Sequence, residues 1–490
     1  MALIDPVLFL GYDLGSHGAK ATLRDLSGQV LASVSRSHTI DRPHPGWQEQ
    51  DPVALWWEEF VDIVRSIKLQ VAARPMAEKG PLRLAGIGIT GFVPGLCALD
   101  RFGLPVRMGI MHTDLRAGAE LQQIQQRLNE PVSLGTLLPK LLWIKDHEPD
   151  TYARISKVLV PHAYLVYRLT GKMVCDYDTA SIYGGIFDAS SHSWDEDACS
   201  RVGIDPLILP KPVPVTARVG ELSPEAAELL SVTQESSVIA GSGDSFASLV
   251  GEGAVSPGDL MIYLGTSATR ILVQAPLQTI AAGPHYGAGR ASFCGRIFSC
   301  GESMEHYRTL LGKEGWRELD AAASEVPPGS DGVFVIPHLK QRGTDEEGLR
   351  DRESIVGLET SHGPDILFRA FLEGVAYRLR EGYEPIEGEV GRILLAGGGA
   401  RSAIFASIIA SVLGRELVLT PDGGASGGMA LLAAWSLGFS PSLDALVGSW
   451  FSKRRIIESD PEAVTYYTRA YPRYKKIVSV IDDLYRIIDR

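Results

Sequence analysis

The residue whose type and setting best suit acid–base chemistry is Asp244. It follows the apolar run Val238–Ala240 and the small residues Gly241–Gly243, which leave space around its carboxylate. A carboxylate that faces a cleft can accept a proton from a substrate hydroxyl, which is the acid–base step of phosphoryl transfer to an alcohol. A single Asp after glycines is also a common turn or N-cap residue, so the position alone leaves both interpretations open.

Two glycine-rich turns could hold the phosphates of a nucleotide. The first, Asp13–Gly18, has the sequence DLGSHG, and the second contains Gly265, Thr266 and Ser267. Glycine lets backbone N–H groups approach an anion, and Ser and Thr hydroxyls add donors. An Asp beside such a turn, here Asp13, can hold Mg²⁺, usually through water. The chain contains no GxxxxGK[ST] sequence, so neither turn is the phosphate loop of that motif.

The two turns belong to an internal repeat. Residues 14–23 (LGSHGAKATL) align with residues 264–273 (LGTSATRILV) at an offset of 250 residues. Both copies predict a strand, a small-residue turn and a second strand that begins after a basic residue. The alignment could be a coincidence between two hairpins, or it could mark a duplicated domain in which each half presents its turn to a shared cleft. The length of 490 residues suits two domains of this size.

A third glycine cluster, Gly397–Gly399, lies between the apolar run Leu394–Ala396 and a helix predicted over 403–413. A strand, glycines and a helix N-terminus allow a nucleoside or phosphate to pack against the backbone. Such turns are also common as plain packing features. The cluster lacks the GxGxxG spacing of NAD-binding folds, so NAD is not expected.

The elements that must position these residues alternate between strands and helices. The N-terminal apolar runs predict antiparallel strands in hairpins. Residues 210–214 (PKPVP) predict a stiff extended connector. Helices are predicted over 52–69, 117–128, 137–146 and 365–381, and from Pro461 to the C-terminus. This alternation predicts a layered α/β architecture.

Composition argues against several other classes of protein. The net charge of −12 and the lack of a basic run argue against nucleic-acid and anionic-membrane partners. The longest apolar stretch, Met429–Phe439, is about half as long as a membrane span, and the N-terminus lacks the basic region of a signal peptide. Five scattered cysteines without a CxxC pair argue against zinc and disulfides. We therefore expect a cytoplasmic protein.

The segments described above together resemble the FGGY family of carbohydrate kinases, and the resemblance runs over nearly the whole chain. Further blocks are similar to those of the family's xylulokinases. They are Gly46–Pro52 (GWQEQDP) with Trp56 and Trp57, His112–Ala117 (HTDLRA), Tyr164–Gly171 (YLVYRLTG) and Phe368–Gly374 (FRAFLEG). Their order along the chain carries more weight than any single block.

The resemblance implies the duplicated actin-like ATPase (ribonuclease H-like) fold, with an N-terminal domain over 1–248 and a C-terminal domain over 249–490 around a central cleft. It also implies Mg-ATP bound between the two domains and phosphoryl transfer to a sugar or polyol. By motif, Asp244 would be the general base and Asp13 would hold the metal. A homodimer is an expectation from the family only. The residues that would contact the nucleotide are Gly15, Ser16, Lys20, Gly265, Thr266, Ser267, Gly397, Gly398 and Gly399.

The departures from the xylulokinase pattern concern the substrate. Xylulokinases carry Gln-Met-His in a segment that brackets the ketose, and this chain has Phe92, Val93 and Pro94 there. Ser245 follows Asp244 at a position where xylulokinases commonly carry Asn. A sugar site lined by these residues has fewer hydrogen-bond donors, so the hydroxyl pattern of its substrate must differ.

We expect an ATP-dependent kinase for a ketopentose-like sugar or small polyol, with xylulokinase as the closest type. One alternative is a kinase for a different substrate, such as ribulose, a deoxyketose or a glycerol-type polyol. Another is a sugar- or nucleotide-sensing relative without catalysis. The presence of Asp13, Asp244, Gly265 and Thr266 argues against that last alternative, because degenerate kinases tend to lose the base or the metal ligand.

Overall fold

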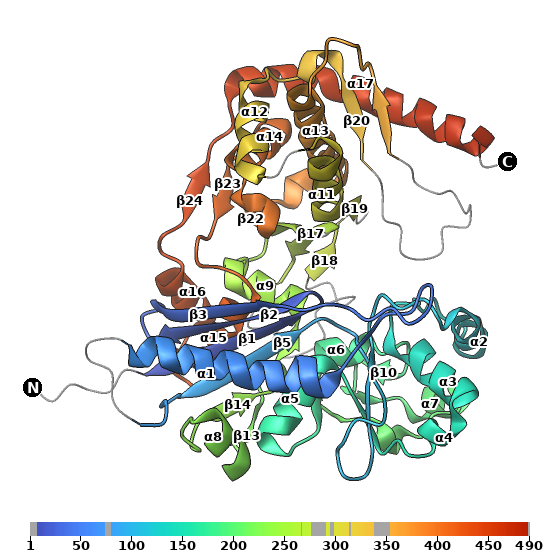
Figure 1. Cartoon of the computed structure of the whole chain (residues 1–490), viewed down its shortest axis with the longest axis vertical. Coiled ribbons are helices and arrows are strands. Elements are labelled where there is room, and N and C mark those ends of the chain that lie inside the picture. Colours follow the sequence, from blue (N-terminus) through green and yellow to red (C-terminus); the bar gives the residue numbers. More distant parts are fainter. Residues whose placement is uncertain are drawn as a thin grey trace, which may run out of the picture. The chain divides into compact units, whose positions relative to one another are not determined.

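The computed structural model describes residues 7–73, 80–265, 267–275, 291–294, 298–312, 315–337 and 353–488 (Figure 1). The chain forms two compact units. Unit 1 comprises Met1–Val255, Ala275–Arg290 and Asp422–Ser452, and unit 2 comprises Ser256–Gln274, Ala291–Pro421 and Lys453–Arg490. The chain therefore returns to the first unit after residue 421. The predicted division into 1–248 and 249–490 has a single boundary and so does not include this return. That boundary stays a prediction.

Unit 1 is built around a mixed seven-stranded sheet. Its strand order is β13-β14-β5-β1-β2-β3, with β15 paired to β5. The first three strands form the antiparallel hairpins that the sequence predicted, and β5 and β14 extend the sheet in parallel from β1. The strands are β1 (Leu8–Gly15), β2 (Gly18–Asp25), β3 (Val30–Ser37), β5 (Gly86–Gly91), β13 (Arg218–Glu221), β14 (Ser237–Ile239) and β15 (Ser242–Gly243).

Unit 2 repeats the order of the six main strands of this sheet. Its order is β18-β17-β16-β22-β23-β24, with β19 paired to β17. The antiparallel pairs β16–β17 and β17–β18 and the parallel pairs β16–β22 and β22–β23 follow the same pattern as in unit 1. The repeat in the sequence is therefore a duplicated domain. The strands are β16 (Asp259–Leu264), β17 (Ser267–Val273), β18 (Ala291–Phe293), β19 (Phe298–Ser299), β22 (Arg392–Ala396), β23 (Leu417–Leu419) and β24 (Arg455–Ile457).

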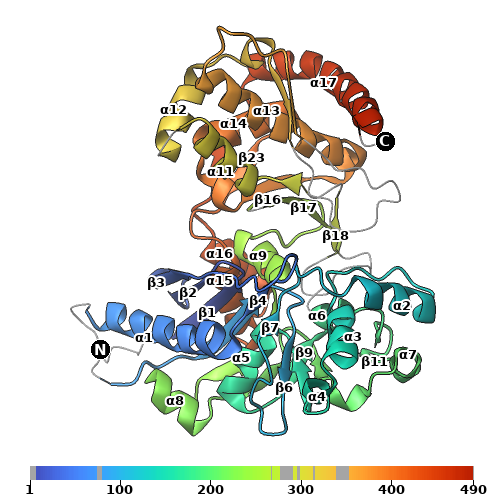
Figure 2. The ribbon, with the colours of Figure 1, turned by 45° about the vertical axis from the view of Figure 1, so that its right-hand side comes forward.

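Helices cover both faces of the unit 1 sheet (Figure 2). The predicted helix over 52–69 is a π-helical segment, Pro52–Glu58, followed by α1 (Glu59–Ala72). The ring of Tyr12 on β1 packs against Phe60 of α1, with centroids 4.7 Å apart. The next face belongs to α15 (Ala425–Ser436), which approaches β1 so closely that a Cβ on Gly11 would lie 1.7 Å from the Ser426 carbonyl oxygen. Only glycine fits at this distance. Successive strand residues point to opposite faces, so Gly11 faces α15 while its neighbour Tyr12 faces α1.

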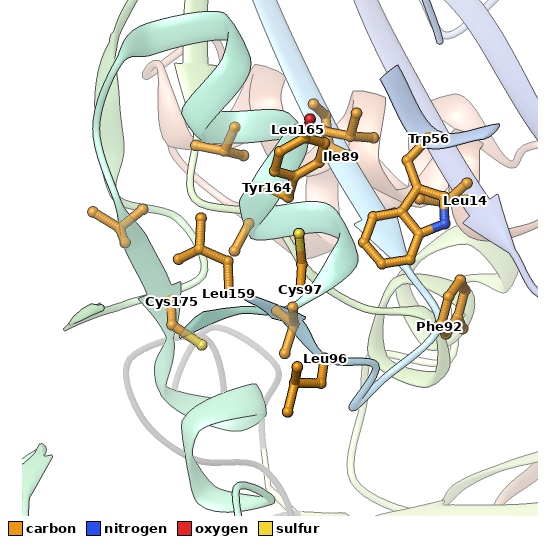
Figure 3. Close-up of a cluster of buried hydrophobic side chains, with 14 of the residues drawn as sticks. Leu14, Trp56, Ile89, Phe92, Leu96, Cys97, Leu159, Tyr164, Leu165 and Cys175 are labelled. Atoms are coloured by element: carbon orange, nitrogen blue, oxygen red, sulfur yellow. The ribbon is translucent and has the colours of Figure 1, made fainter. Parts of the chain in front are cut away.

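The remaining elements of unit 1 enclose a hydrophobic core beside the sheet. Figure 3 shows part of it, where Tyr164, Cys97 and Trp56 lie in one buried cluster. Residues 211–213, expected in a stiff extended connector, form a strand that pairs in parallel with β9 (Val174–Asp176). The extended backbone was predicted, but its partner was not. The elements are β4 (Glu49–Gln50), β6 (Cys97–Leu99), β7 (Gly109–Ile110), α2 (Gly118–Leu128), α3 (Leu137–His147), α4 (Pro149–Tyr152), β8 (Lys157–Leu159), α5 (Pro161–Thr170), β9 (Val174–Asp176), α6 (Tyr177–Ser181), β10 (Phe187–Asp188), β11 (Ser193–Trp194), α7 (Glu196–Val202), β12 (Lys211–Val213), α8 (Pro224–Leu230), α9 (Asp244–Glu252) and α16 (Leu443–Trp450).

A buried ion pair fixes the longest core helix of unit 2, α13 (Pro364–Tyr383), which was predicted over 365–381. Arg369 Nε donates to Glu373 Oε1 at 3.0 Å, and the Tyr467 hydroxyl donates to the same oxygen at 2.7 Å. The FRAFLEG block is thus a structural feature of this helix. The other elements of unit 2 are α11 (Gly301–Leu310), α12 (Trp316–Glu325), β20 (Phe334–Ile336), β21 (Ser354–Val356), α14 (Ala403–Leu413) and α17 (Pro461–Ile488).

Within the ranges that the structure describes, none of the helices combines the length and the apolar character needed to cross a membrane.

Arg369→Leu tests the contribution of the buried ion pair between Arg369 and Glu373 to stability. It leaves the carboxylate of Glu373 buried without its cation, and removal of one partner of a buried ion pair costs about 3–5 kcal/mol. We expect the free energy of unfolding of unit 2 to fall by about 3 kcal/mol in urea denaturation followed by circular dichroism. The control is Arg201→Leu on α7, whose partner Asp197 is exposed. It should change stability by no more than about 1 kcal/mol, and equal losses in the two variants would contradict the assignment.

Candidate functional site

Three charged residues predicted for the site lie at one end of the unit 1 sheet. Asp13 is on β1, Lys20 pairs with it in register on β2, and Asp244 is the first residue of α9. Burial and, next, the negative charge of Asp244 raise the pKa of Asp13 to about 7, although the charge of Lys20 acts in the opposite direction. The fold therefore brings both Lys20 and Asp244 within electrostatic reach of Asp13.

The loop that carries Asp244 is held by its own backbone and by β5. Gly241 has a φ of +83°, and a Cβ there would lie 2.2 Å from the Ile89 carbonyl oxygen, so the position requires glycine. The Thr90 hydroxyl donates a 2.8 Å hydrogen bond to the Ser242 carbonyl oxygen. These contacts fix the start of α9, and with it Asp244, at the end of β5.

The surroundings of Asp244 suit a proton acceptor. Burial raises its pKa, while hydrogen bonds from the backbone and side chain of Ser245 lower it. The Ser245 hydroxyl donates to Asp244 Oδ1 at 3.3 Å. Gly243 is the N-cap of α9, so Asp244 does not serve as the cap residue, which was one alternative that the sequence left open. A carboxylate with a raised pKa at the end of a sheet is a candidate general base.

Two carbonyl groups of the first glycine turn accept hydrogen bonds from side chains that lie outside the turn. His38 Nε2 donates to the Gly15 carbonyl oxygen at 3.0 Å, and Gln50 Nε2 donates to the Ser16 carbonyl oxygen at 2.8 Å. His38 Nδ1 lies 3.0 Å from a carboxylate oxygen of Glu59. Both partners of His38 are acceptors, so both bonds form when the imidazole is protonated on both nitrogens. The carbonyl oxygens of Gly15 and Ser16 therefore each accept a hydrogen bond from a side chain outside the turn.

His38 and Gln50 were not identified from the sequence. Gln50 lies in the GWQEQDP block, and its amide oxygen also accepts from Trp56 Nε1 at 2.9 Å, so the block itself was the available signal. His38 is separated from the turn by a whole strand pair and carries no local signal. Its position is decided by the pairing of β2 with β3.

The three residues predicted to line a sugar site have different exposure. Phe92 is buried in the core, and its ring packs against Trp56 with centroids 5.8 Å apart (Figure 3). Pro94 is buried as well, whereas Val93 is half-buried. A Cβ on Gly243 would lie 2.6 Å from Val93 Cγ2, so Val93 packs against the loop that precedes the candidate base. A role of this segment in substrate binding stays a prediction, and Val93 is its best-placed residue.

The second glycine turn occupies the matching position in unit 2. Gly265 follows β16, its N–H donates to the Ser267 carbonyl oxygen at 3.1 Å, and its own carbonyl accepts from the Gly301 N–H at 2.8 Å. As in unit 1, the turn carbonyl is held by a neighbouring segment. Thr266 lies outside the described residues.

The third glycine cluster meets this turn at the ends of neighbouring parallel strands. A Cβ on Gly397 would lie 2.5 Å from the carbonyl oxygen of Leu264, the last residue of β16. Gly397–Gly399 lead into α14, whose N-cap Ser402 accepts from the Phe405 N–H at 3.2 Å. Open parallel sheets bind ligands at the carboxyl ends of their strands. Both glycine segments of unit 2 therefore lie at the carboxyl ends of the parallel strands β16 and β22.

The basic residues of the two repeat copies have different roles. Lys20 is exposed and acts on Asp13. Its counterpart Arg270 is buried and donates to the Cys294 and Arg378 carbonyl oxygens at 2.7 and 2.9 Å. The second copy thus uses its cation to hold backbone, close to the charge of Glu381, whereas the first copy places its cation beside Asp13.

Known proteins resemble the chain along most of its length. The model of the FGGY family of carbohydrate kinases, N-terminal domain, matches residues 8–251, and that of the C-terminal domain matches residues 260–437. The xylulose kinase of Lactococcus lactis is 28% identical over 488 residues, which cover 96% of both chains. The xylulose kinase of Escherichia coli is 29% identical over 426 residues, 84% of this chain and 86% of the relative. The crystal structure of xylulose kinase from Rhodospirillum rubrum aligns with a TM-score of 0.79 and 26% identity, covering 98% of this chain and 100% of that one.

Asp13→Asn tests the electrostatics of the site through the pH dependence of stability. The pKa of Asp13 is about 7 in the folded chain against an ordinary 3.8, so the folded state holds this proton more tightly than the unfolded state. The resulting stabilisation is present below about pH 4 and is lost as the pH rises towards 7, with a slope of at most about 1.4 kcal/mol per pH unit. We expect the variant to flatten this part of the profile in urea denaturation with EDTA present.

In Asp13→Asn the free energy of unfolding should still fall as the pH rises towards 8, which leaves a residual slope. It belongs to Glu252, because burial raises the pKa of that carboxyl to about 8. The control is Asp62→Asn, on the exposed face of α1. A profile for Asp13→Asn that matches those of the wild type and this control would show that Asp13 is not perturbed.

Proposed function

The chain belongs to the FGGY family of carbohydrate kinases, and on that premise we propose that it transfers a phosphoryl group from ATP to a ketopentose-like sugar or small polyol, with Asp244 as the general base. Its two sheets with one strand order are the duplicated actin-like ATPase fold of the family. The observation that carries the proposal is the placement of Asp244 beside Asp13 at the end of the unit 1 sheet.

Asp244 would act on the acceptor hydroxyl. Phosphoryl transfer leaves little covalent chemistry to the protein, so the carboxylate has to orient the hydroxyl and take its proton as the new P–O bond forms. The raised pKa of Asp244 favours uptake of that proton. The Thr90 and Ser245 contacts hold the loop and the carboxylate in place before the substrate binds. Such pre-positioning is a main source of rate enhancement when a second reactant must be aligned.

Asp13 suits a magnesium ion that accompanies the nucleotide. Its Oδ1 atom is buried and has no hydrogen-bond partner among the residues that the structure describes. Those residues contain no group of three or more His, Cys, Asp or Glu side chains that could form a complete protein cage. Mg²⁺ is commonly held by one or two carboxylates together with waters and substrate phosphates, which fits one free carboxylate oxygen. When bound, the ion would neutralise charge on the phosphates.

The glycine turns would hold the ATP phosphates and nucleoside. In unit 1 we assign Gly15, Ser16 and Lys20 to phosphate contacts, because the turn amides and the hydroxyl are donors and Lys20 is an exposed cation. In unit 2 we assign the turn Gly265–Ser267 to the phosphates and Gly397–Gly399 to the nucleoside. Gly398 is open, since a Cβ there would meet no atom of the described residues within 4 Å.

The relatives named above are xylulose kinases, which makes a ketopentose the first candidate substrate. A second candidate is a substrate with fewer hydroxyls, such as a deoxyketose or a glycerol-type polyol; ribulose is a further ketopentose to test. The observation that favours a substrate with fewer hydroxyls is Val93, whose apolar side chain packs on the loop that carries the candidate base. A sensing role without catalysis would need the base to be dispensable, and the perturbed pair of Asp13 and Asp244 supports catalysis instead.

Asp244→Asn tests the base. The amide keeps the shape of the carboxylate but cannot accept the proton, and general bases contribute about 10²–10⁴-fold. We expect kcat to fall at least about 10²-fold in an assay of sugar-stimulated ADP release over a panel of ketoses and polyols, with ATP binding retained in calorimetry.

The same panel run on the wild type separates kinase from sensor. Activity with any acceptor removes the sensing alternative. Asp62→Asn is the matched control, because it makes the same change on the exposed face of α1. If Asp244→Asn keeps more than about a tenth of the wild-type kcat, another residue is the base.

Val93→Thr tests the substrate site. The substitution keeps the shape of the side chain and adds a hydroxyl, so a substrate hydroxyl near this position would gain a partner. We expect the ratio of kcat/KM for xylulose to that for a deoxyketose to change by about 10-fold, the size of one polar contact in a specificity site. The control is Val53→Thr, at an exposed position of the π-helical segment Pro52–Glu58. Equal ratios in the three proteins would place Val93 outside the sugar site.

A further inference from the structure

A buried histidine–aspartate pair lies next to the site and has no role in the function proposed above. His162 is the second residue of α5, and its Nε2 donates to Asp176 Oδ2 at 2.8 Å, with both side chains fully buried. Asp176 also caps α6 by accepting from the Thr179 N–H at 2.9 Å. Burial alone would raise the pKa of Asp176, but the hydrogen bond and charge of His162 hold it below its ordinary value. Asp176 is therefore a carboxylate acceptor, and His162 is the donor.

The imidazole packs against the loop that presents Asp244. A Cβ on Gly241 would lie 3.3 Å from His162 Cδ2, so the ring supports the turn between β14 and α9. The backbone nitrogen of His162 would lie 3.4 Å from a Cβ on Gly91, at the end of β5. His162 is thus in contact with both segments whose pairing fixes Asp244.

The pair also places a charge that acts on Asp244. A protonated His162 favours the ionised carboxylate, whereas burial disfavours it. Among the described residues, Asp13 of β1 acts on Asp244, with Lys20 beside it on β2. The helix α6, which contacts β15, begins with the carboxyl groups of Asp176 and Asp178. The helix α15, which packs along α9, and the strand β5 carry no ionisable side chain. Neither of these two elements therefore carries a charge that could replace that of a protonated His162.

One atom of this pair lacks a protein partner. His162 Nδ1 is buried, and no described residue forms a hydrogen bond with it. A buried polar atom without a partner costs free energy, so such atoms are rare unless a function requires them. A ring that served packing alone could be replaced by an apolar side chain at no such cost.

We propose that His162, oriented by Asp176, is a positioning residue for Asp244. The imidazole supports the Gly241 turn, and in its protonated form it keeps the neighbouring carboxylate ionised and so able to take up the hydroxyl proton. Asp176 fixes the ring and stabilises the imidazolium, as a carboxylate does for a histidine in other catalytic sites. This inference rests on the proposed function, in which Asp244 is the base.

The experiment separates charge from hydrogen bonding at His162. His162→Gln keeps a donor for Asp176 but has no charge, and His162→Lys keeps a cation. In full-length protein with the best acceptor of the sugar panel, we expect His162→Gln to lower kcat by about 10-fold or more while KM for ATP stays within about 2-fold. His162→Lys should recover most of that loss. Asp176→Asn should act in the same direction as His162→Gln.

The matched control is His147→Gln, because His147 also pairs with a carboxylate, that of Glu120, at 3.0 Å but is half exposed on α3. It should leave kcat and KM unchanged. Wild-type kcat in His162→Gln would overturn the proposal, and so would equal losses in the Gln and Lys variants, since both would then report packing only. Thermal unfolding shows whether each variant is folded, and Asp176→Asn takes the place of one that is not.

A second measurement separates this inference from the proposed function. Hydrogen exchange of the segment 241–247, followed by mass spectrometry, does not depend on any acceptor. We expect faster exchange in His162→Gln and wild-type exchange in His162→Lys. If the wild type phosphorylates no acceptor, the proposed function fails, and the exchange result decides the positioning role alone: unchanged exchange in His162→Gln would overturn it.

Discussion

The site of unit 1 depends on one constraint: β5 pairs with β1 on one side and with β15 on the other. Asp13 of β1 and Ser242 of β15 both lie opposite Thr90 of β5, in one row across the sheet. Because parallel strands end at the same edge, the turn after β1 and the start of α9 meet there. The backbone register brings Asp244 towards Asp13, and the contacts of Thr90 and His162 hold its loop there.

One face of the unit 1 sheet, opposite the face covered by α1, is covered by residues 422–452, which are distant from its strands in the sequence. The Thr22 and Ser426 hydroxyls are 2.8 Å apart, and Arg24 donates to the Asp422 carbonyl oxygen. Gly11 allows α15 to lie directly on β1. These contacts explain why unit 1 is discontinuous: α15, in residues 422–452, covers one face of its central strands β1, β2 and β5. The glycines and small residues of this segment are therefore required for close packing and are not themselves evidence of ligand binding.

Duplication kept the strand order and changed the side chains that use it. Each copy has a glycine turn after its first central strand, and in each the turn carbonyl is held by a neighbour, His38 in unit 1 and the Gly301 N–H in unit 2. The cation after the turn acts on a carboxylate in unit 1, as Lys20, and holds backbone in unit 2, as Arg270. One backbone plan thus provides a carboxylate site in the first copy and a glycine-lined backbone site in the second.

The sequence by itself determined the features that depend on neighbouring residues. Glycine spacing located the turns, apolar periodicity located α13 and α14 to within a few residues, and the repeat of residues 14–23 predicted the duplicated sheet. These features follow from local backbone preference and burial, which adjacent residues encode. Only the tertiary structure decided which residues support the site. His38, Gln50 and the pair of His162 with Asp176 reach it from separate elements, and the return of residues 422–452 joins segments about 400 positions apart. A hydrogen bond between distant residues leaves no spacing in the chain, because its geometry exists only after the strands have paired.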